Sequence, residues 1–156
     1  MKLELAYYYG TSFFDRCVAW WDNDPTHVAI KYGEEKIEAK PFKGVRKVHW
    51  RLYSPYSKVV VCKLKHITDE QSKIVWSWLE EQVGKGYDYL GIFGFVISDP
   101  KIENPKRWFC SELSEAAFQR AGIILTPTSE YPSEVSPSMQ FSFRNSWSEE
   151  IYTVTT

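Results

Sequence analysis

Residues 27–40 read HVAIKYGEEKIEAK, with two β-prone runs on either side of a turn. The runs at 27–32 and 36–40 are predicted strands, and Gly33-Glu34-Glu35 is the turn that joins them. A third run, SKVVVCKLK at residues 57–65, is rich in β-branched residues and predicts another strand. These runs predict a sheet that contains at least one antiparallel hairpin.

Helical patterns occur between and after these strands, without a regular βαβ alternation. Helices are predicted over residues 13–21, from Thr68 to Gly84, and from Cys110 to Ala121. Thr68 and Gln71 have the spacing of a capping box, and Gly84 and Gly122 are stop signals. The side chains of the second helix that are expected to face the core are Ile74, Val75, Trp78 and Leu79.

The C-terminal tail, residues 126–148, is rich in Pro, Ser and Thr and is predicted as a wrapping loop. Phe141-Ser142-Phe143 is expected to add a last edge strand. A chain of 156 residues suits one domain, residues 1–156, and is long enough to bury a hydrophobic core. The mixture of strands and helices predicts an α+β fold.

The composition is typical of a globular domain, with 44% hydrophobic and 25% charged residues. A net charge of −1 predicts no bulk attraction to nucleic acid or membranes. The charge is uneven, because residues 1–66 carry 12 Lys and Arg against 7 Asp and Glu, whereas residues 67–156 carry 7 against 13. The basic stretch from Lys36 to Lys65 could attract an anionic partner, but a solvated surface is the simpler interpretation.

The cysteines and the N-terminus bear on cofactors and location. Cys17, Cys62 and Cys110 form no CxxC pair, and their odd number argues against a disulfide framework. We therefore expect no metal and no cofactor. The start, MKLELAY, lacks the apolar segment of a signal peptide, and no run of about 18 apolar residues exists. The expectation is a protein that is cytoplasmic as synthesised.

Cys110 is the strongest candidate for chemistry, within the segment RWFCSEL at residues 107–113. A thiol at a helix start faces unpaired backbone N–H groups and the positive end of the helix dipole, which favour the thiolate. The same amides can hold an oxyanion. Taken alone, a cysteine at such a position is more often a small buried residue, so the hypothesis requires a partner. Cys17, in an apolar helix, and Cys62, within a strand, are expected to be inert.

His27, which opens the first strand of the hairpin, is the predicted partner and general base. The other two histidines, His49 and His66, have contexts typical of surface or capping residues. If the turn holds only Gly33-Glu34, Glu38 becomes the diagonal neighbour of His27 on the same face and can orient the imidazole. A three-residue turn could instead move Glu38 to the opposite face of the sheet, and the alternative interpretation of Glu38 is an exposed edge glutamate.

These segments, in this order, resemble the circularly permuted branch of the NlpC-type papain-like cysteine peptidase superfamily, and the YiiX-like proteins within it. In ordinary members the cysteine precedes the histidine, whereas here the histidine segment comes first, as in the permuted branch. The resemblance spans roughly residues 9–140. The segments that carry it are Thr26–Ile30, Ile37–Ala39, Gly44-Val45, Gly86–Asp88 and Phe109–Leu113.

The resemblance implies a papain-like fold with permuted topology, in which the helix carrying the cysteine packs on a small antiparallel sheet. It implies a catalytic triad of Cys110, His27 and Glu38, and a thiol peptidase or amidase that cleaves amide bonds, often in cell-wall peptides. Tyr87 and Asp88, in an irregular stretch expected to line the cleft, are the predicted substrate-binding residues. YiiX-like proteins commonly carry an export signal, so its absence suits an intracellular or phage-encoded member.

Two alternatives to a peptidase stay open at this stage. One is a thiol acyltransferase or hydrolase that acts on lipids and resembles lecithin–retinol acyltransferase. That group has Asn-Cys-Glu-His around its nucleophile, which Phe109-Cys110-Ser111-Glu112 does not match, although the 17% aromatic content fits an apolar ligand. The other is a non-catalytic binding module on the same fold, which need not react selectively at Cys110.

Overall fold

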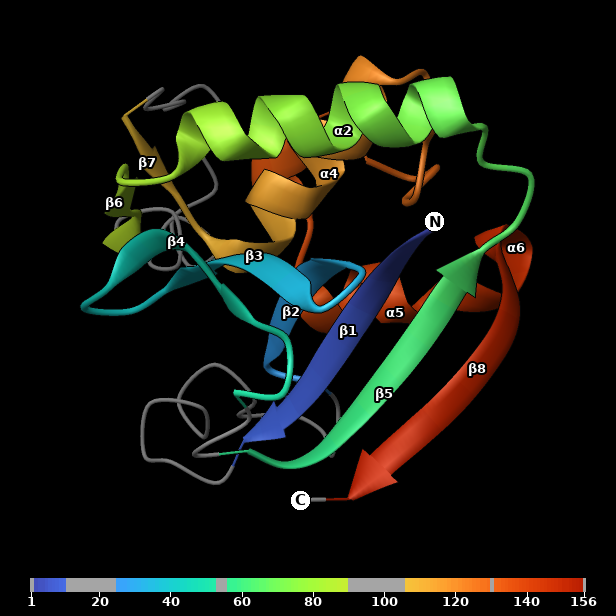
Figure 1. Ribbon diagram of the computed structural model, residues 1–156, viewed down its shortest axis with the longest axis horizontal. Coiled ribbons are helices and arrows are strands. Elements are labelled where there is room, and N and C mark those ends of the chain that lie inside the picture. The colour runs from blue at the N-terminus through green and yellow to red at the C-terminus, as the bar shows by residue number, and fades with distance from the viewer. Residues whose placement is uncertain (1, 11–24, 53–55, 90–105, 130, 156) are drawn as a thin grey trace.

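The computed structural model (Figure 1) describes residues 2–10, 25–52, 56–89, 106–129 and 131–155. Within these ranges the chain is mixed α+β, with a six-stranded sheet and several helices. The strands are β1 (Leu3–Gly10), β2 (His27–Tyr32), β3 (Glu35–Lys40), β4 (Gly44–His49), β5 (Tyr56–Leu64), β6 (Gly86–Tyr87), β7 (Arg107–Trp108) and β8 (Ser148–Thr155). The helices are α2 (Asp69–Gln82), α4 (Cys110–Arg120), α5 (Pro137–Ser142) and α6 (Arg144–Trp147), with a 3-10 turn η1 (Pro132–Glu134).

The large sheet has the strand order β4-β3-β2-β1-β5-β8, and every neighbouring pair is antiparallel. The first strand, β1, therefore lies inside the sheet, while β8 lies at one edge (Figure 1). The short strands β6 and β7 form a separate parallel pair. Because β7 ends two residues before Cys110, this pair leads the chain directly into α4.

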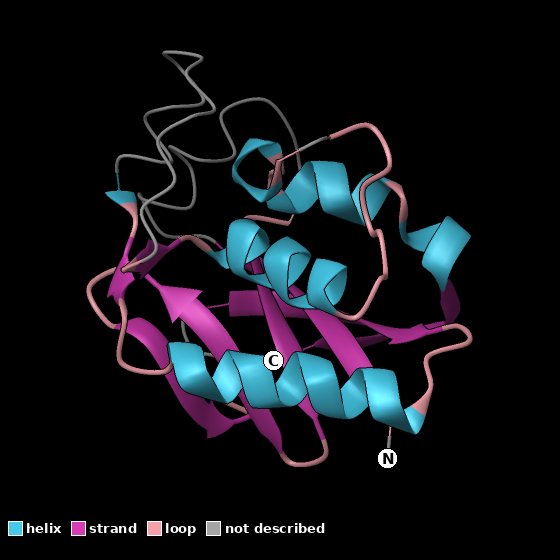
Figure 2. Cartoon of the chain, turned by 90° about the horizontal axis from the view of Figure 1, so that it is seen from above, coloured by secondary structure: helices cyan, strands magenta, loops and turns pink. Residues whose placement is uncertain are grey.

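Alternate residues of the strands supply two apolar layers. Leu3, Leu5 and Tyr7 of β1 belong to the larger core, which also includes residues of α2 and α4. Ala6 and Tyr8 of the same strand belong to a smaller buried cluster on the other face. Viewed from above, α2 and α4 lie over the sheet (Figure 2). The sheet therefore carries one face toward α4 and a second face with its own buried side chains.

The predicted hairpin is confirmed, and its turn has two residues. Tyr32 pairs with Glu35, which leaves only Gly33 and Glu34 between the strands, so β3 begins one residue earlier than expected. Gly33 adopts a φ of 62°, the left-handed conformation that glycine tolerates without strain. This register places Glu38 on the same face as His27, since side chains alternate along each strand.

The helices at residues 68–84 and 110–121 are also confirmed, with one error in the predicted core. The capping box of α2 forms between Thr68 and Gln71, and α4 begins at Cys110. Ile74 is 41% exposed, whereas its neighbour Trp76 is buried at 9% exposure, so the apolar face is rotated relative to the prediction. The predicted helix at 13–21 lies outside the described residues. No described helix has the length and apolar character that crossing a membrane requires.

The predictions for the C-terminal tail are wrong in part. Phe141 lies in α5 and Phe143 follows it, so the expected edge strand at 141–143 does not form. Ser136 caps this helix, since the backbone N–H of Met139 donates to its Oγ at 3.1 Å, and a proline follows at the first helical position. The Ser-Pro signals that predicted a loop are helix-start signals here. The edge strand is instead β8.

Gly44, the first residue of β4, allows this strand to lie against the segment that precedes β6. It has a φ of 67°, and a Cβ at this position would lie 2.3 Å from the Lys85 carbonyl oxygen. The next residue, Val45, donates its backbone N–H to that same oxygen at 2.8 Å and accepts from Gly84 at 2.9 Å. Only glycine allows this close approach, which joins β4 to the segment before β6.

Candidate active site

Cys110 occupies the first turn of α4. The N-cap residue is Phe109, whose carbonyl accepts the first helical hydrogen bond from Leu113 at 3.0 Å. The side chain of Glu112 accepts the backbone N–H of Phe109 at 3.3 Å, which fixes the entry of the chain into the helix. Backbone N–H groups in a first turn have no acceptor within their own helix. Cys110, a residue that is 5% exposed, therefore stands beside these N–H groups at the positive end of the helix dipole.

His27 is the first residue of β2 and is held from the neighbouring strand. The backbone N–H of Thr26 donates to the Tyr8 carbonyl at 3.0 Å, and the Tyr8 and His27 rings lie 5.4 Å apart. The imidazole is buried, with 3% of His27 exposed. The imidazole therefore extends from the first residue of a strand and not from a loop.

The imidazole of His27 connects Cys110 with Glu38. Its Nε2 lies 2.8 Å from Glu38 Oε2, and a side-chain hydrogen bond links the ring to the Cys110 thiol. Because Glu38 engages Nε2, Nδ1 is the nitrogen that remains for Cys110. Burial disfavours the charged imidazole, but the hydrogen bonds to Cys110 and Glu38 outweigh it and raise the pKa of His27 to about 9. At neutral pH the ring is therefore mainly an imidazolium.

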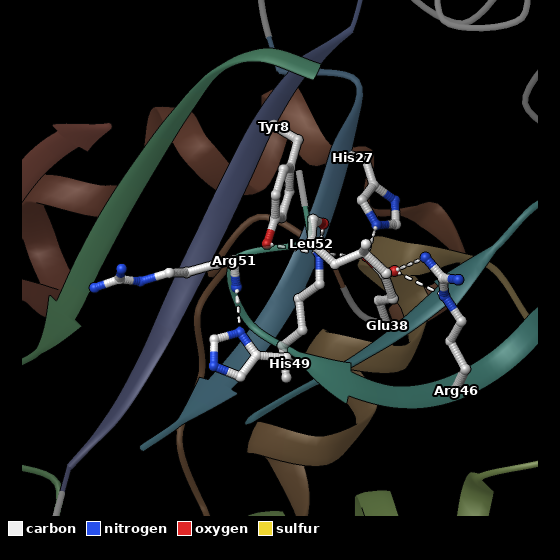
Figure 3. Close-up of polar contacts among 8 residues, drawn as sticks. Tyr8, His27, Glu38, Arg46, His49, Arg51 and Leu52 are labelled. Carbon is white, nitrogen blue, oxygen red and sulfur yellow. Dashed lines mark hydrogen bonds and ion pairs between the residues drawn. The ribbon is translucent and has the colours of Figure 1, made fainter. Parts of the chain in front are cut away.

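Glu38 is a buried carboxylate that contacts three basic side chains, those of His27, Lys36 and Arg46. Figure 3 shows His27 and Arg46 directed at it. Arg46 donates from Nε and Nη2 to Oε1 at 2.9 and 2.6 Å. The Nζ of Lys36 lies 3.2 Å from Oε2, the oxygen that also binds His27. Burial raises the pKa of Glu38, but His27, Lys36 and Arg46 outweigh it and hold the pKa well below its usual range. The carboxylate therefore stays ionised at any physiological pH.

Cys110, His27 and Glu38 form a hydrogen-bonded series that runs from a thiol, through an imidazole, to a carboxylate that stays ionised. Glu38 orients the ring and compensates the positive charge that His27 carries when protonated. The ring can then hold the proton of the Cys110 thiol on one nitrogen while its other nitrogen stays bound to the carboxylate. This arrangement can stabilise a thiolate and return a proton to a leaving group.

Tyr87 and Asp88, the predicted substrate-binding residues, lie next to the segment that enters α4. Tyr87 pairs with Trp108 through the short parallel strands, and the Asp88 N–H donates to the Trp108 carbonyl at 3.1 Å. The Tyr87 ring packs on Tyr89 at a centroid distance of 5.1 Å. Both residues are nearly buried, at 7% and 5% exposure, so they offer little surface to a ligand.

The remaining histidines and Cys62 have the environments that the sequence predicted. His49 is exposed and lies 3.4 Å from Glu34, and His66 is also exposed. Cys62 is fully buried within β5, and burial raises the pKa of its thiol to about 12. Cys17 lies outside the described residues.

Three residues of this site were missed from the sequence: Tyr8, Lys36 and Arg46. Arg46 had a usable signal, because it stands directly opposite Glu38 in the β3–β4 pairing and opposite charges often face each other across strands. Lys36 shares the face of Glu38 at a spacing of two residues, but a lysine on a strand is ordinarily assigned to solvent. Tyr8 comes from a strand that the sequence analysis did not predict.

No protein-family model matches the chain, and a comparison with curated proteins finds no match. The site is therefore interpreted from its own geometry and chemistry.

Proposed function

We propose that this protein is a cysteine hydrolase, a peptidase or amidase, with Cys110 as nucleophile, His27 as general base and acid, and Glu38 as the residue that orients His27. The observation that carries the proposal is the continuous contact from Cys110 through His27 to Glu38. His27 thereby joins a thiol at a helix start to an ionised carboxylate.

The reaction starts from an ion pair in which His27 already holds the Cys110 proton, so that a thiolate stands beside an imidazolium. The thiolate attacks the carbonyl carbon of the substrate, and its sulfur forms a bond to that carbon. The carbonyl oxygen becomes negative, and backbone N–H groups of the first turn of α4 are positioned to stabilise it. Collapse of this intermediate breaks the carbon–nitrogen bond, and His27 gives its proton to the departing amine. A thioester of Cys110 remains.

Hydrolysis of the thioester completes the cycle. His27, now neutral, accepts a proton from water while the water oxygen attacks the acyl carbon. The carbon–sulfur bond breaks, the acid product leaves, and the thiolate and imidazolium are restored. Glu38 keeps its charge throughout and holds the ring in place.

An amide substrate is supported by the proton that His27 can carry and pass to a leaving amine. An amine leaves a tetrahedral intermediate only when it is protonated. The contacts with Cys110 and Glu38 raise the pKa of His27 to about 9, so the ring carries a proton at neutral pH before the thiolate attacks. We therefore propose a peptide or amide substrate, and cell-wall peptides as the first class to test.

A permuted papain-like topology fits this proposal. The strand that carries His27 precedes the helix that carries Cys110, and α4 contacts β2 and β3 of an antiparallel sheet. In a papain-like site a cysteine helix and a histidine strand meet in the same way, with the chain order reversed in ordinary members. The proposal of permuted topology rests on that order.

A lipid substrate is the second candidate, and one observation favours it. Phe42, in the turn between β3 and β4, is 84% exposed and adopts a φ of 63°. Its backbone N–H donates to the Tyr89 hydroxyl at 2.6 Å, and the two rings lie 5.7 Å apart. Tyr89 in turn packs on Tyr87, so apolar rings extend from the surface toward the segment before Cys110.

The test is incubation of the full chain with cell-wall peptides and, separately, with phospholipid vesicles, with Cys110→Ala as control. Release of free amine from peptides that disappears in Cys110→Ala supports the proposal. Cys110-dependent release or transfer of an acyl group from phospholipid, with peptides untouched, would replace it by the lipid alternative. Absence of both, together with no selective alkylation of Cys110, would leave a binding module.

A further inference from the structure

Lys36 is a buried lysine to which the proposed reaction assigns no role. Its side chain is fully buried, and its Nζ has three polar neighbours. The Tyr8 hydroxyl lies at 3.0 Å, the Leu52 carbonyl at 2.9 Å and Glu38 Oε2 at 3.2 Å. An ammonium group has three N–H donors, so each donor has one acceptor. The surroundings of Lys36 are therefore built for the charged form, although burial lowers its pKa.

Lys36 and His27 share one oxygen atom. Nε2 of His27 lies 2.8 Å and Nζ of Lys36 lies 3.2 Å from Oε2 of Glu38, so the two nitrogens are at most about 6 Å apart. Arg46 binds the other oxygen, Oε1, and is 23% exposed at its side chain. Lys36 is thus the cation that competes most directly with His27 for the charge of Glu38.

We propose that Lys36 is a positioning residue of this site: its ammonium fixes Oε2 of Glu38 toward His27 and limits how tightly that carboxylate holds the imidazolium proton. The inference rests on the proposed function. Without a competing cation, Glu38 would hold the proton on His27 more tightly, and transfer to a leaving amine would become harder. Lys36 therefore leaves His27 protonated at neutral pH but makes that proton easier to donate.

Several other charged or titratable groups act on His27, directly or through Glu38 and Lys36. Among the described residues, Tyr8 on β1, Glu38 on β3 and Cys110 on α4 lie against His27 itself. Arg46 on β4 acts on His27 through Glu38, and Lys40 on β3 acts on Lys36. A titration of His27 is simpler to interpret in Cys110→Ala, because the thiol no longer contributes and the imidazole titrates in contact with Glu38.

The experiment is an NMR titration of the His27 ring in the full chain carrying Cys110→Ala, with and without Lys36→Met. The His27 signals are assigned by their loss in His27→Gln. Methionine keeps the length of the lysine stem and removes the charge. We expect Lys36→Met to move the His27 midpoint upward by about one pH unit. In the chain with Cys110 intact, the alkaline limb of the pH–rate profile moves in the same direction.

Lys31→Met is the matched control, because Lys31 lies directly opposite Lys36 on the neighbouring strand and contacts Glu4, not Glu38. It should leave the His27 midpoint unchanged. An unchanged or lowered midpoint in Lys36→Met would overturn the proposal.

Lys36→Gln repeats the test if Lys36→Met does not fold. Failure of both variants to fold, while Lys31→Met folds, would assign Lys36 a purely structural role and also overturn the proposal. The titration needs no substrate, so its outcome is separate from whether the protein hydrolyses amides.

Discussion

Cys62 and Cys110 are both buried cysteines, with 0% and 5% exposure, but they stand in opposite chemical surroundings. Cys62 lies in the middle of β5 among apolar side chains, and burial raises the pKa of its thiol to about 12. Cys110 lies at a helix start and shares a hydrogen bond with a histidine that an ionised glutamate supports. Because both cysteines are buried, the difference between their chemical environments arises from the groups that contact each thiol. A buried thiol becomes a nucleophile only where cationic and N–H groups are arranged to meet its charge.

The largest expected effect separates the two cysteines by activity. Cys110→Ala should lower amide hydrolysis by about 10⁴-fold or more, because no other group can form the acyl-enzyme. Cys62→Ala should keep the rate per folded molecule within about threefold, since Cys62 touches no reacting group. Initial rates on a peptide substrate, normalised to folded protein, make the comparison. A rate that survives Cys110→Ala would reject the assigned nucleophile.

A smaller loss of activity is expected when Glu38, the carboxylate that orients His27, is replaced. Glu38→Gln keeps the shape of the side chain but removes its charge, which should lower the rate by about 10²-fold and lower the pKa of His27. The control is Glu35→Gln on the same strand, where the carboxylate is half exposed and pairs with Lys47. Equal rates in the two variants would show that Glu38 does not act through His27.

The pH dependence of stability should also report the His27 contacts. A folded-state pKa of about 9, against an ordinary value of 6.5, means that stabilisation is complete below pH 6.5 and is lost as pH rises toward 9. We expect the free energy of unfolding to fall by about 2–3 kcal/mol across that window. The raised pKa of Cys62 removes stability only above its ordinary value of 9.0. Glu38, with its lowered pKa, contributes above its ordinary value of 4.5, and this contribution is lost in acid.

Urea unfolding of the wild type and of His27→Gln between pH 6 and 9 measures this effect. The fall with pH should be present in the wild type and nearly absent in the variant. Parallel curves for the two proteins would contradict the account of His27.

The smallest expected effect concerns Cys62 alone. Cys62→Ser places a hydroxyl in an apolar layer and should cost about 1–2 kcal/mol of stability beyond Cys62→Ala, which isolates the polar penalty from the lost sulfur. Thermal or urea unfolding measures the difference. Serine tolerated without cost would show that β5 offers a hydrogen-bond partner, and the contrast between the two cysteines would weaken.

The parts of the site that follow local rules could be predicted from the sequence. The alternation of the hairpin and the glycine at its turn fix which face Glu38 shares with His27. The start of α4 at Cys110 follows from its local pattern as well. These features depend on residues that are close in the chain.

The parts that depend on distant strands could not be predicted. Lys36 is buried because Tyr8 from β1 and the Leu52 carbonyl after β4 meet its ammonium, and neither contact has a local signal. The tail was mistaken because Ser136 and the proline after it are compatible both with a loop and with a helix start. Tertiary packing decides between such alternatives.

The most direct test of the central claim, that His27 activates Cys110, is the alkylation rate of each cysteine. Folded protein is treated with iodoacetamide at pH 7, and the labelled Cys110 and Cys62 peptides are quantified over time by mass spectrometry. The account predicts that Cys110 reacts at least about 100-fold faster than Cys62 and that His27→Ala removes most of this advantage. Equal rates at the two cysteines, or a Cys110 rate that His27→Ala leaves unchanged, would contradict it.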